Sequence, residues 1–257
     1  MLILLPPSEG KTAAVRGKSL ELTDLSFPEL TSARTQVLEA LVELSAAPEA
    51  ADVLGVPATQ PELLERNQRL GSAATSRADR VYSGVLYDAL GLTDLSPAGK
   101  RRASSRLAIT SALFGLVRPG DRIPAYRLSG DARLPGLPGS GSVAGHWRAH
   151  LGPVITDAVG RGLLVDLRST SYAAFWRPTG VRTATVRVLH EVAGRRQVVS
   201  HFNKATKGRL VRALLEDGAD PRTPQALAAA WERLGWTVEL DTDPSGGGRL
   251  DVVVSEI

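Results

Sequence analysis

The first residues that could do chemistry are the polar side chains of the segment PPSEGKT, residues 6–12, which follows a short apolar stretch. Its last three residues match the end of a phosphate-binding P-loop, but Leu5 stands where that loop needs its first glycine. The cradle of backbone N–H groups is therefore missing, which argues against a nucleoside triphosphatase. Ser8, Lys11 and Thr12 could still contact an anion, with Lys11 as a point charge. They could equally form a polar turn over the end of a sheet.

A second candidate lies where the apolar run 107–117 ends in the sequence RPGD. The run predicts one buried strand, and binding sites in open sheets lie where strands end. Arg118 and Arg127 could therefore make bidentate contacts with a phosphate or a carboxylate. The structural alternative is that Arg118 pairs with Asp121 while Tyr126 packs in the core.

A third candidate is a group of polar residues after the predicted strand 163–167. Arg168, Ser169 and Tyr172 suit hydrogen bonds to a polar ligand. Clusters of Ser and Thr also cap helices, so a structural role stays open.

The fourth candidate is a group of cations near a helix start. Lys204, Lys207 and Arg209 begin a helix predicted over 204–216, after a strand predicted over 197–202. The helix macrodipole disfavours cations at an N-terminus. Their placement there indicates that an anion also binds there.

Two patterns resemble metal or hydrolase sites but are incomplete. His146 and His150 stand four apart on a predicted helix, but Trp147 stands where a zinc protease has its glutamate, and Arg148 would repel a cation. No G-x-S-x-G nucleophile elbow is present in a strand–turn–helix context. Cysteine is absent, which excludes disulfides, thiolate–zinc sites and iron–sulfur clusters. We expect no bound metal and no cofactor.

The elements that position these residues mix strands and helices. Apolar or alternating runs predict strands at 2–5, 107–117, 163–167, 183–191, 197–202, 237–240 and 250–255. Periodic or capped runs predict helices at 31–44, after Thr59, after Ser96, at 143–159, 204–216 and 224–234. This mixture predicts an α/β fold (or a mixed α+β fold), with a mixed sheet flanked by helices in a single domain spanning 1–257. No apolar run reaches 18 residues, so we expect no transmembrane helix.

Charge is distributed unevenly along the chain. Residues 100–212 carry 20 Lys and Arg against 5 Asp and Glu, whereas both flanks are acidic, and the whole chain has a net charge of +4. A block this basic predicts a surface or cleft for anions, most simply phosphates. The alternative is that the basic side chains are solvated, or paired with the acidic flanks after folding.

Seven segments occur together in one order along nearly the whole chain: residues 1–12, 81–84 (VYSG), 113–121 (LFGLVRPGD), 124–127 (PAYR), 146–147, 169–172 (STSY) and 202–209 (FNKATKGR). Together they resemble the YaaA-like peroxide-stress proteins of bacteria. The resemblance implies a cytosolic protein with a family-specific α/β fold, linked to peroxide tolerance, to lowering of free intracellular iron and to DNA binding. It also implies a helix-hairpin-helix DNA-binding element at about residues 35–75.

The best hairpin in that element is Leu54–Pro57, in a region of net negative charge. Acidic surroundings oppose phosphate binding, so we expect the basic block to dominate contact with DNA. The expected partner is double-stranded DNA bound without sequence preference and weakened by salt. Aromatic residues are only 5% of the chain, too few for a base-stacking platform. Without a cysteine thiolate, protection from peroxide must be indirect.

An enzyme is the alternative reading. Segments after strand ends could converge in one basic pocket for a small phosphorylated or purine-like substrate, and a desolvated Lys or Tyr there could act as an acid or base. The pocket residues are predicted as Lys11, Tyr82, Arg118, Ser169, Tyr172 and Lys204, with Lys11, Tyr82 and Lys204 as catalytic candidates. The apolar start is too short for a signal peptide and lacks a basic region, so we expect a cytoplasmic protein that does not bind membranes.

Overall fold

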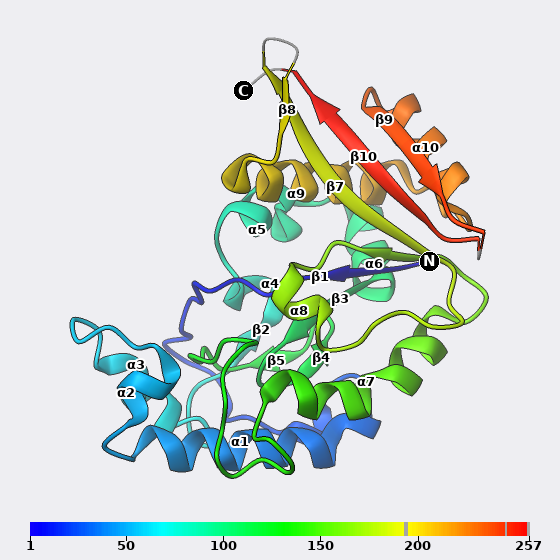
Figure 1. Ribbon diagram of the computed structural model, residues 1–257. Helices are drawn as coiled ribbons and strands as arrows, with labels where there is room; N and C mark the ends of the chain where they lie inside the picture. Colours follow the sequence, from blue (N-terminus) through cyan, green and yellow to red (C-terminus); the bar gives the residue numbers. More distant parts are fainter. Residues whose placement is uncertain (193–194, 245, 256–257) are drawn as a thin grey trace.

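The computed structural model describes residues 1–192, 195–244 and 246–255. Within them the main sheet has eight strands in the order β4–β3–β1–β6–β7–β10–β9, with β8 paired to β7 (Figure 1). The strands are β1 (Leu2–Leu5), β3 (Leu107–Ser111), β4 (Gly115–Val117), β6 (Leu164–Asp166), β7 (Thr183–Val192), β8 (Arg195–Gln197), β9 (Thr237–Thr242) and β10 (Gly248–Val254). A separate ribbon pairs β2 (Ser76–Arg77) with β5 (Arg122–Ile123). The predicted mixed sheet is confirmed.

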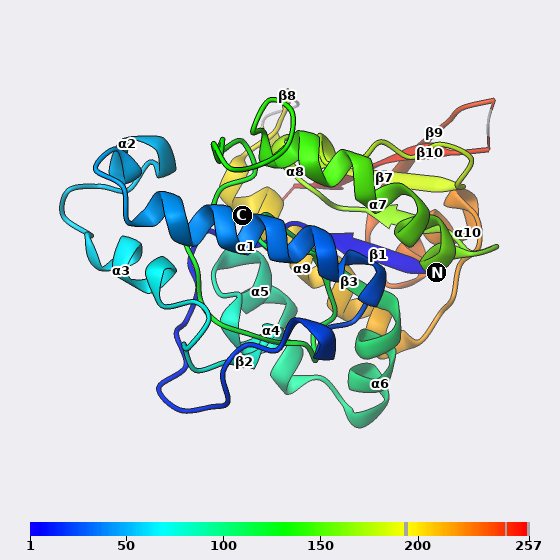
Figure 2. The ribbon, with the colours of Figure 1, turned by 90° about the horizontal axis from the view of Figure 1, so that it is seen from below.

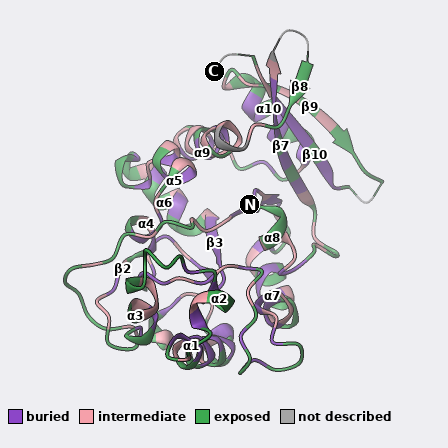
Figure 3. Ribbon diagram, turned by 60° about the vertical axis from the view of Figure 1, so that its left-hand side comes forward, coloured by how far each residue is buried: buried purple, intermediate pink, exposed green. Residues whose placement is uncertain are grey.

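The middle of the sheet is parallel. β1 pairs in parallel with β3 on one side and with β6 on the other, and β7 and β10 continue the parallel order. The outer strands β4 and β9 are antiparallel to their neighbours. All four residues of β1 are fully buried, as expected for a parallel strand covered on both faces. Figure 3 shows burial falling toward the edge, from a mostly buried β10 to a largely exposed β9.

Helices cover both faces of the sheet (Figures 1 and 2). α1 (Thr31–Ser45) and α7 (Val143–Val159) lie on one face, while α5 (Val85–Leu90), α6 (Pro97–Arg106), α9 (Ser200–Asp217) and α10 (Pro224–Arg233) lie on the other. The helices predicted at 31–44, 143–159 and 224–234 are confirmed. The hydroxyl of Ser96 caps α6 by accepting the backbone N–H of Gly99 at 3.0 Å. Among the described residues, no helix combines the length and apolar character that a bilayer crossing requires.

The prediction of a single strand over 107–117 is wrong. The run folds as β3, a tight reversal and the antiparallel β4. Gly115 permits the reversal, because its φ is +69° and a Cβ there would lie 2.5 Å from the ring of Trp147. The buried Arg34 holds the turn by donating from Nε to the carbonyl of Phe114 at 3.1 Å. The chain therefore leaves β4 at the end of the sheet where β3 begins.

The strand predicted over 197–202 is also wrong. β8 is only three residues long, and α9 already begins at Ser200, with the backbone N–H of Asn203 donating to the carbonyl of Val199 at 2.8 Å. The cations predicted to start this helix consequently lie one turn or more inside it.

The segment predicted to form a helix-hairpin-helix element contains most of α1, then α2 (Ala50–Leu54) and α3 (Glu62–Gln68). α2 ends at Gly55, whose φ of +57° lies in the left-handed region, so the chain turns at this glycine. Thr59 does not cap the next helix, because Pro61 occupies the capping position and makes no side-chain cap bond. Whether this element binds DNA stays a prediction.

Candidate anion-binding site

The candidate site lies at the edge of the sheet where β1, β3 and β6 end. The three strands are parallel neighbours, so their carboxyl ends share one edge. The chain continues from β1 to β3 on one side and from β6 to β7 on the other, so the connections diverge between β1 and β6. Open α/β sheets commonly bind ligands outside such a point of divergence.

Lys11 reaches this edge on the loop after β1. The loop pairs with the segment after α4 (Ala78–Val81): Lys11 and Tyr82 form an antiparallel bridge, and the N–H of Thr12 donates to the carbonyl of Val81 at 2.8 Å. The partly buried ammonium of Lys11 donates to the carbonyl of Ser8 at 2.9 Å and more weakly to that of Glu9 at 3.3 Å. Backbone geometry thus fixes where the charge sits.

Two buried tyrosine rings lie beside the ammonium, and their hydroxyls are bonded to each other. Lys11 Nζ lies 4.3 Å from the ring centroid of Tyr126 and 5.9 Å from that of Tyr82. The hydroxyl of Tyr126 is 3.1 Å from that of Tyr82 and 2.8 Å from that of Ser111, which ends β3. Burial raises the pKa of both tyrosines well above the ordinary value. They therefore act near neutral pH as hydrogen-bonding groups and not as phenolate bases.

Lys11 is electrostatically unusual. Its pKa is lowered to about 7, first by burial and then by the charge of Arg127, against an opposing effect of Glu9; the charge of Arg66 lowers it further. No described carboxylate lies within hydrogen-bonding or ion-pairing distance of its ammonium. An anion bound here would supply the missing countercharge and raise this pKa.

Arg127 adds a second cation, held by Asn67 of α3 and by Gly55, which follows α2. Its backbone N–H donates to the side-chain oxygen of Asn67 at 2.8 Å, and the Asn67 amide returns a bond to the Arg127 carbonyl at 2.8 Å. Its guanidinium Nη2 donates to the carbonyl of Gly55 at 3.2 Å. The Nε of Arg127 is buried and has no hydrogen-bond partner. Buried donors are normally satisfied, so this N–H is available to an acceptor such as a phosphate oxygen.

Two further predicted residues lie at this edge. Tyr172, on the short helix α8 (Thr170–Ala173), packs against Phe175, and burial followed by the proximity of Tyr126 raises its pKa. Lys207 donates from Nζ to the carbonyl of Leu167 at 3.3 Å. Burial lowers the pKa of Lys207, against an opposing effect of Asp166.

Arg168 is bonded within the protein, and its predicted contact with a ligand stays a prediction. Its buried guanidinium forms a two-pronged pair with Asp166, at 2.9 and 2.7 Å, and donates to the carbonyls of Tyr172 and Trp176. Since each nitrogen of the guanidinium already has an acceptor, Arg168 fixes the path of the chain around α8.

Arg118 lies away from the cluster. Because β4 reverses the chain, Arg118 follows the end of the sheet where β3 begins, and it donates to the carbonyls of Ser105 and Leu107 at 2.8 Å each. Asp121 pairs with the backbone N–H of Arg118, at 2.9 Å, and not with its guanidinium. The expectation that Arg118 and Lys11 share one site is wrong.

The other predicted residues are exposed. Thr12, Ser169, Lys204 and Arg209 lie at the surface, and Ser169 precedes α8 without capping it. Lys204 and Arg209 lie beyond the first turn of α9, where the helix macrodipole mainly acts, so their position does not indicate an anion at the helix N-terminus. Two residues near the site, Asn67 and Tyr87, were not predicted from the sequence. The hydroxyl of Tyr87 donates to the carbonyl of Pro6 at 2.7 Å. No motif spacing indicates either residue, since α3 and α5 are distant in sequence from the residues that Asn67 and Tyr87 contact.

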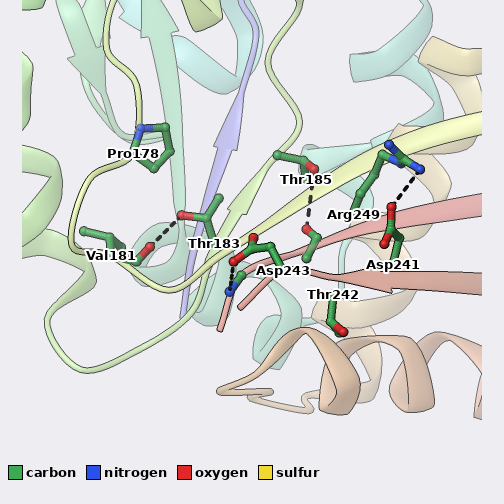
Figure 4. A pocket seen from close by; sticks show the side chains of 10 residues that line it. Pro178, Val181, Thr183, Thr185, Asp241, Thr242, Asp243 and Arg249 are labelled. Carbon is green, nitrogen blue, oxygen red and sulfur yellow. Dashed lines mark hydrogen bonds and ion pairs between the residues drawn. The ribbon is translucent and has the colours of Figure 1, made fainter. Parts of the chain in front are cut away.

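Two pockets in the described structure lie outside this cluster. Figure 4 shows one of about 280 Å³ beside β7, β9 and β10, where Arg249 is paired with Asp241 at 3.0 Å. The other, of about 360 Å³, lies between α4 and α6. Neither contains a residue predicted for the site. Among the residues described, no three His, Asp or Glu side chains group as metal ligands.

Comparison with known proteins places the chain in a family. Residues 1–241 match the family described as "Peroxide stress protein YaaA". The chain belongs to this family. It is 51% identical over 265 residues to a UPF0246 protein of Streptomyces coelicolor, covering 100% of both chains. It is 45% identical over 245 residues to a UPF0246 protein of Corynebacterium efficiens (94% of this chain and 96% of that one), and 40% identical over 255 residues to one of Corynebacterium glutamicum (99% and 100%).

The YaaA resemblance is thus confirmed. Four of the segments that carried it, at residues 1–12, 81–84, 124–127 and 169–172, meet around Lys11 in this YaaA-family chain.

Proposed function

We propose that this member of the peroxide-stress family binds double-stranded DNA and holds a backbone phosphate between Lys11 and Arg127. One observation carries the proposal: two half-buried cations lie close enough that the charge of Arg127 lowers the pKa of Lys11, and no described carboxylate pairs with either of them. The buried Nε of Arg127 also lacks a hydrogen-bond acceptor. Burial of like charges is costly unless an anion compensates them. A phosphate supplies both the charge and the acceptor oxygens.

The segment of α2 and α3, which was predicted as a DNA-binding hairpin, supports DNA as the source of that phosphate. Its Gly55 carbonyl contacts the guanidinium of Arg127, so a strand tracked by the hairpin would pass beside the cationic pair. The tyrosines of the cluster are buried and bonded to one another, which leaves them unsuited to stacking on exposed bases. Duplex DNA bound through its backbone fits this arrangement better than a single strand.

Protection from peroxide follows indirectly from this role. The chain has no cysteine and hence no thiolate that could reduce peroxide. In this proposal the protein covers DNA and limits the damage that iron and peroxide cause there.

The test is duplex binding measured by fluorescence anisotropy over a series of salt concentrations. Lys11→Ala and Arg127→Ala should each weaken binding and reduce the salt slope by about one unit, as expected for the loss of one phosphate contact. Arg161→Ala is the matched control, because Arg161 is exposed and precedes β6 at the opposite edge of the sheet. Equal affinity and slope in all three folded variants would overturn the proposal.

A second candidate function is catalysis on a small phosphorylated or purine-like substrate. The observation that favours it is the lowered pKa of Lys11, since a lysine that titrates near 7 can exchange a proton at neutral pH. Tyr82 and Tyr172 support such a site, whereas Arg118 lies elsewhere and Lys204 is exposed. Incubation with nucleotides and purines, followed by mass spectrometry, should reveal a product that Lys11→Ala does not form. Unchanged compounds across that panel would exclude this candidate.

A further inference from the structure

The pocket between α4, the turn Leu92–Asp94 and α6 is independent of the Lys11 cluster. It has a volume of about 360 Å³, within the usual range for small-molecule sites. Its lining residues are Arg77, Asp79, Arg80, Leu92, Thr93, Lys100, Ala103, Ser104 and Pro119. None of them contributes to the contacts around Lys11.

Two positive charges in this pocket are uncompensated. Arg77 is paired with Asp79, with its closest contact at 2.6 Å, so these two charges cancel. Arg80 and Lys100 are exposed, and neither side chain has a hydrogen bond or ion pair with any described residue. Asp79 is the only acidic residue in the pocket lining, which leaves two net positive charges facing one space.

The walls of the pocket are fixed by backbone hydrogen bonds. The first N–H groups of α4 donate to the turn after β4: Ala78 to the carbonyl of Asp121 at 2.8 Å, and Asp79 to that of Pro119 at 3.0 Å. The buried side chains of Leu92 and Ala103 add an apolar part to the lining. A preformed wall reduces the ordering cost of binding.

We propose that this pocket binds a phosphate monoester, with Arg80 and Lys100 on the phosphate and the carbon part of the ligand over Leu92 and Ala103. A phosphate monoester carries a charge of about −1.5 to −2 near pH 7, which matches the two free cations. The pocket in Figure 4 offers no such match, because its arginine is already paired with Asp241. A phosphate monoester of this kind occurs on a free nucleotide and at the phosphorylated end of a DNA strand.

Calorimetric titration with adenosine 5′-monophosphate tests the proposal, with adenosine as the probe that lacks phosphate. The wild-type protein should bind the nucleotide and not the nucleoside. Arg80→Ala/Lys100→Ala should weaken nucleotide binding at least about tenfold, as expected for two lost charge-assisted contacts. Arg101→Ala is the matched control, since Arg101 is exposed on the same helix but does not line the pocket.

Two further measurements distinguish a free nucleotide from a DNA strand end, and this pocket from the Lys11 cluster. Duplexes with a 5′-phosphate or a 5′-hydroxyl should bind differently only if a strand end is the natural ligand. Lys11→Ala should leave nucleotide binding at this pocket unchanged, so a failure of the DNA proposal does not affect this test. Equal nucleotide binding by the wild-type protein and the double variant, or loss of binding in Lys11→Ala alone, would overturn the assignment.

Discussion

The ammonium of Lys11 lies 4.3 Å from the ring centroid of Tyr126, and the two residues come from loops more than a hundred positions apart. The aromatic face stabilises the charged form, while burial and Arg127 destabilise it. The pKa of Lys11 is lowered to about 7, first by burial and then by Arg127, and a bound anion would shift it upward.

The first prediction concerns stability and pH. Below pH 7, Lys11 is charged in both the folded and the unfolded chain. Between about 7 and the ordinary value of 10.5, the unfolded chain holds a proton that the folded chain has released. The contribution of Lys11 to the free energy of unfolding therefore rises with pH through this window. Urea denaturation of Lys11→Met should lack that rise, whereas Lys18→Met, at an exposed position, should keep it.

The second prediction concerns binding and pH. Duplex affinity should fall as pH rises through about 7, because Lys11 loses the charge that attracts phosphate. Lys11→Arg stays charged and should flatten this dependence. Anisotropy titrations at fixed ionic strength measure both proteins. An identical pH profile for the two would show that Lys11 does not contact the DNA.

The third prediction separates a structural arginine from a binding one. Arg118→Ala removes bonds to the carbonyls of Ser105 and Leu107 and the contact of its guanidinium with the ring of Phe27, 4.8 Å away. It should lower the free energy of unfolding by about 1–3 kcal/mol while duplex affinity stays the same. Denaturation and anisotropy measured on one preparation give both values. A loss of duplex affinity without a loss of stability would show that Arg118 contacts DNA.

The fourth prediction tests the reversal between β3 and β4. Gly115→Ala combines a positive φ with a clash against the Trp147 ring and should destabilise the protein by about 2–4 kcal/mol. Gly139→Ala shares the positive φ but meets no atom within 4 Å, so it should cost only about 1 kcal/mol. Thermal denaturation ranks the two. Similar melting temperatures would mean that the Trp147 ring does not pack on Gly115.

The fifth prediction concerns the buried pair behind α8. Arg168→Ala leaves the largely buried Asp166 carboxylate without its partner and should cost about 3–5 kcal/mol. Arg196→Ala breaks exposed pairs with Glu191 and Glu239 and should change stability far less, because water screens those charges. Chemical denaturation should therefore separate the two by several kcal/mol, and comparable values would contradict the structural role of Arg168.

The largest difference between expectation and structure arises at one glycine. The run 107–117 is mostly apolar, and a buried hairpin has the same composition as a buried strand. Only Gly115 indicated a break in the strand. Its left-handed conformation and its close contact with the Trp147 ring belong to the folded structure. That single reversal moves Arg118 to the opposite end of the sheet from the Lys11 cluster.

From sequence alone, local patterns determined most helices and strands, the mixed sheet and the family, because periodicity, caps and motifs act over short stretches of chain. They also made Lys11 a candidate site residue. Tertiary structure alone decided which cations are free. The guanidinium groups of Arg118 and Arg168 donate to carbonyls or to a carboxylate in the folded chain. Arg127, in contrast, has a buried N–H without a partner. Hydrogen-bond partners distant in the sequence, and the burial that changes a pKa, are set only when the strands assemble.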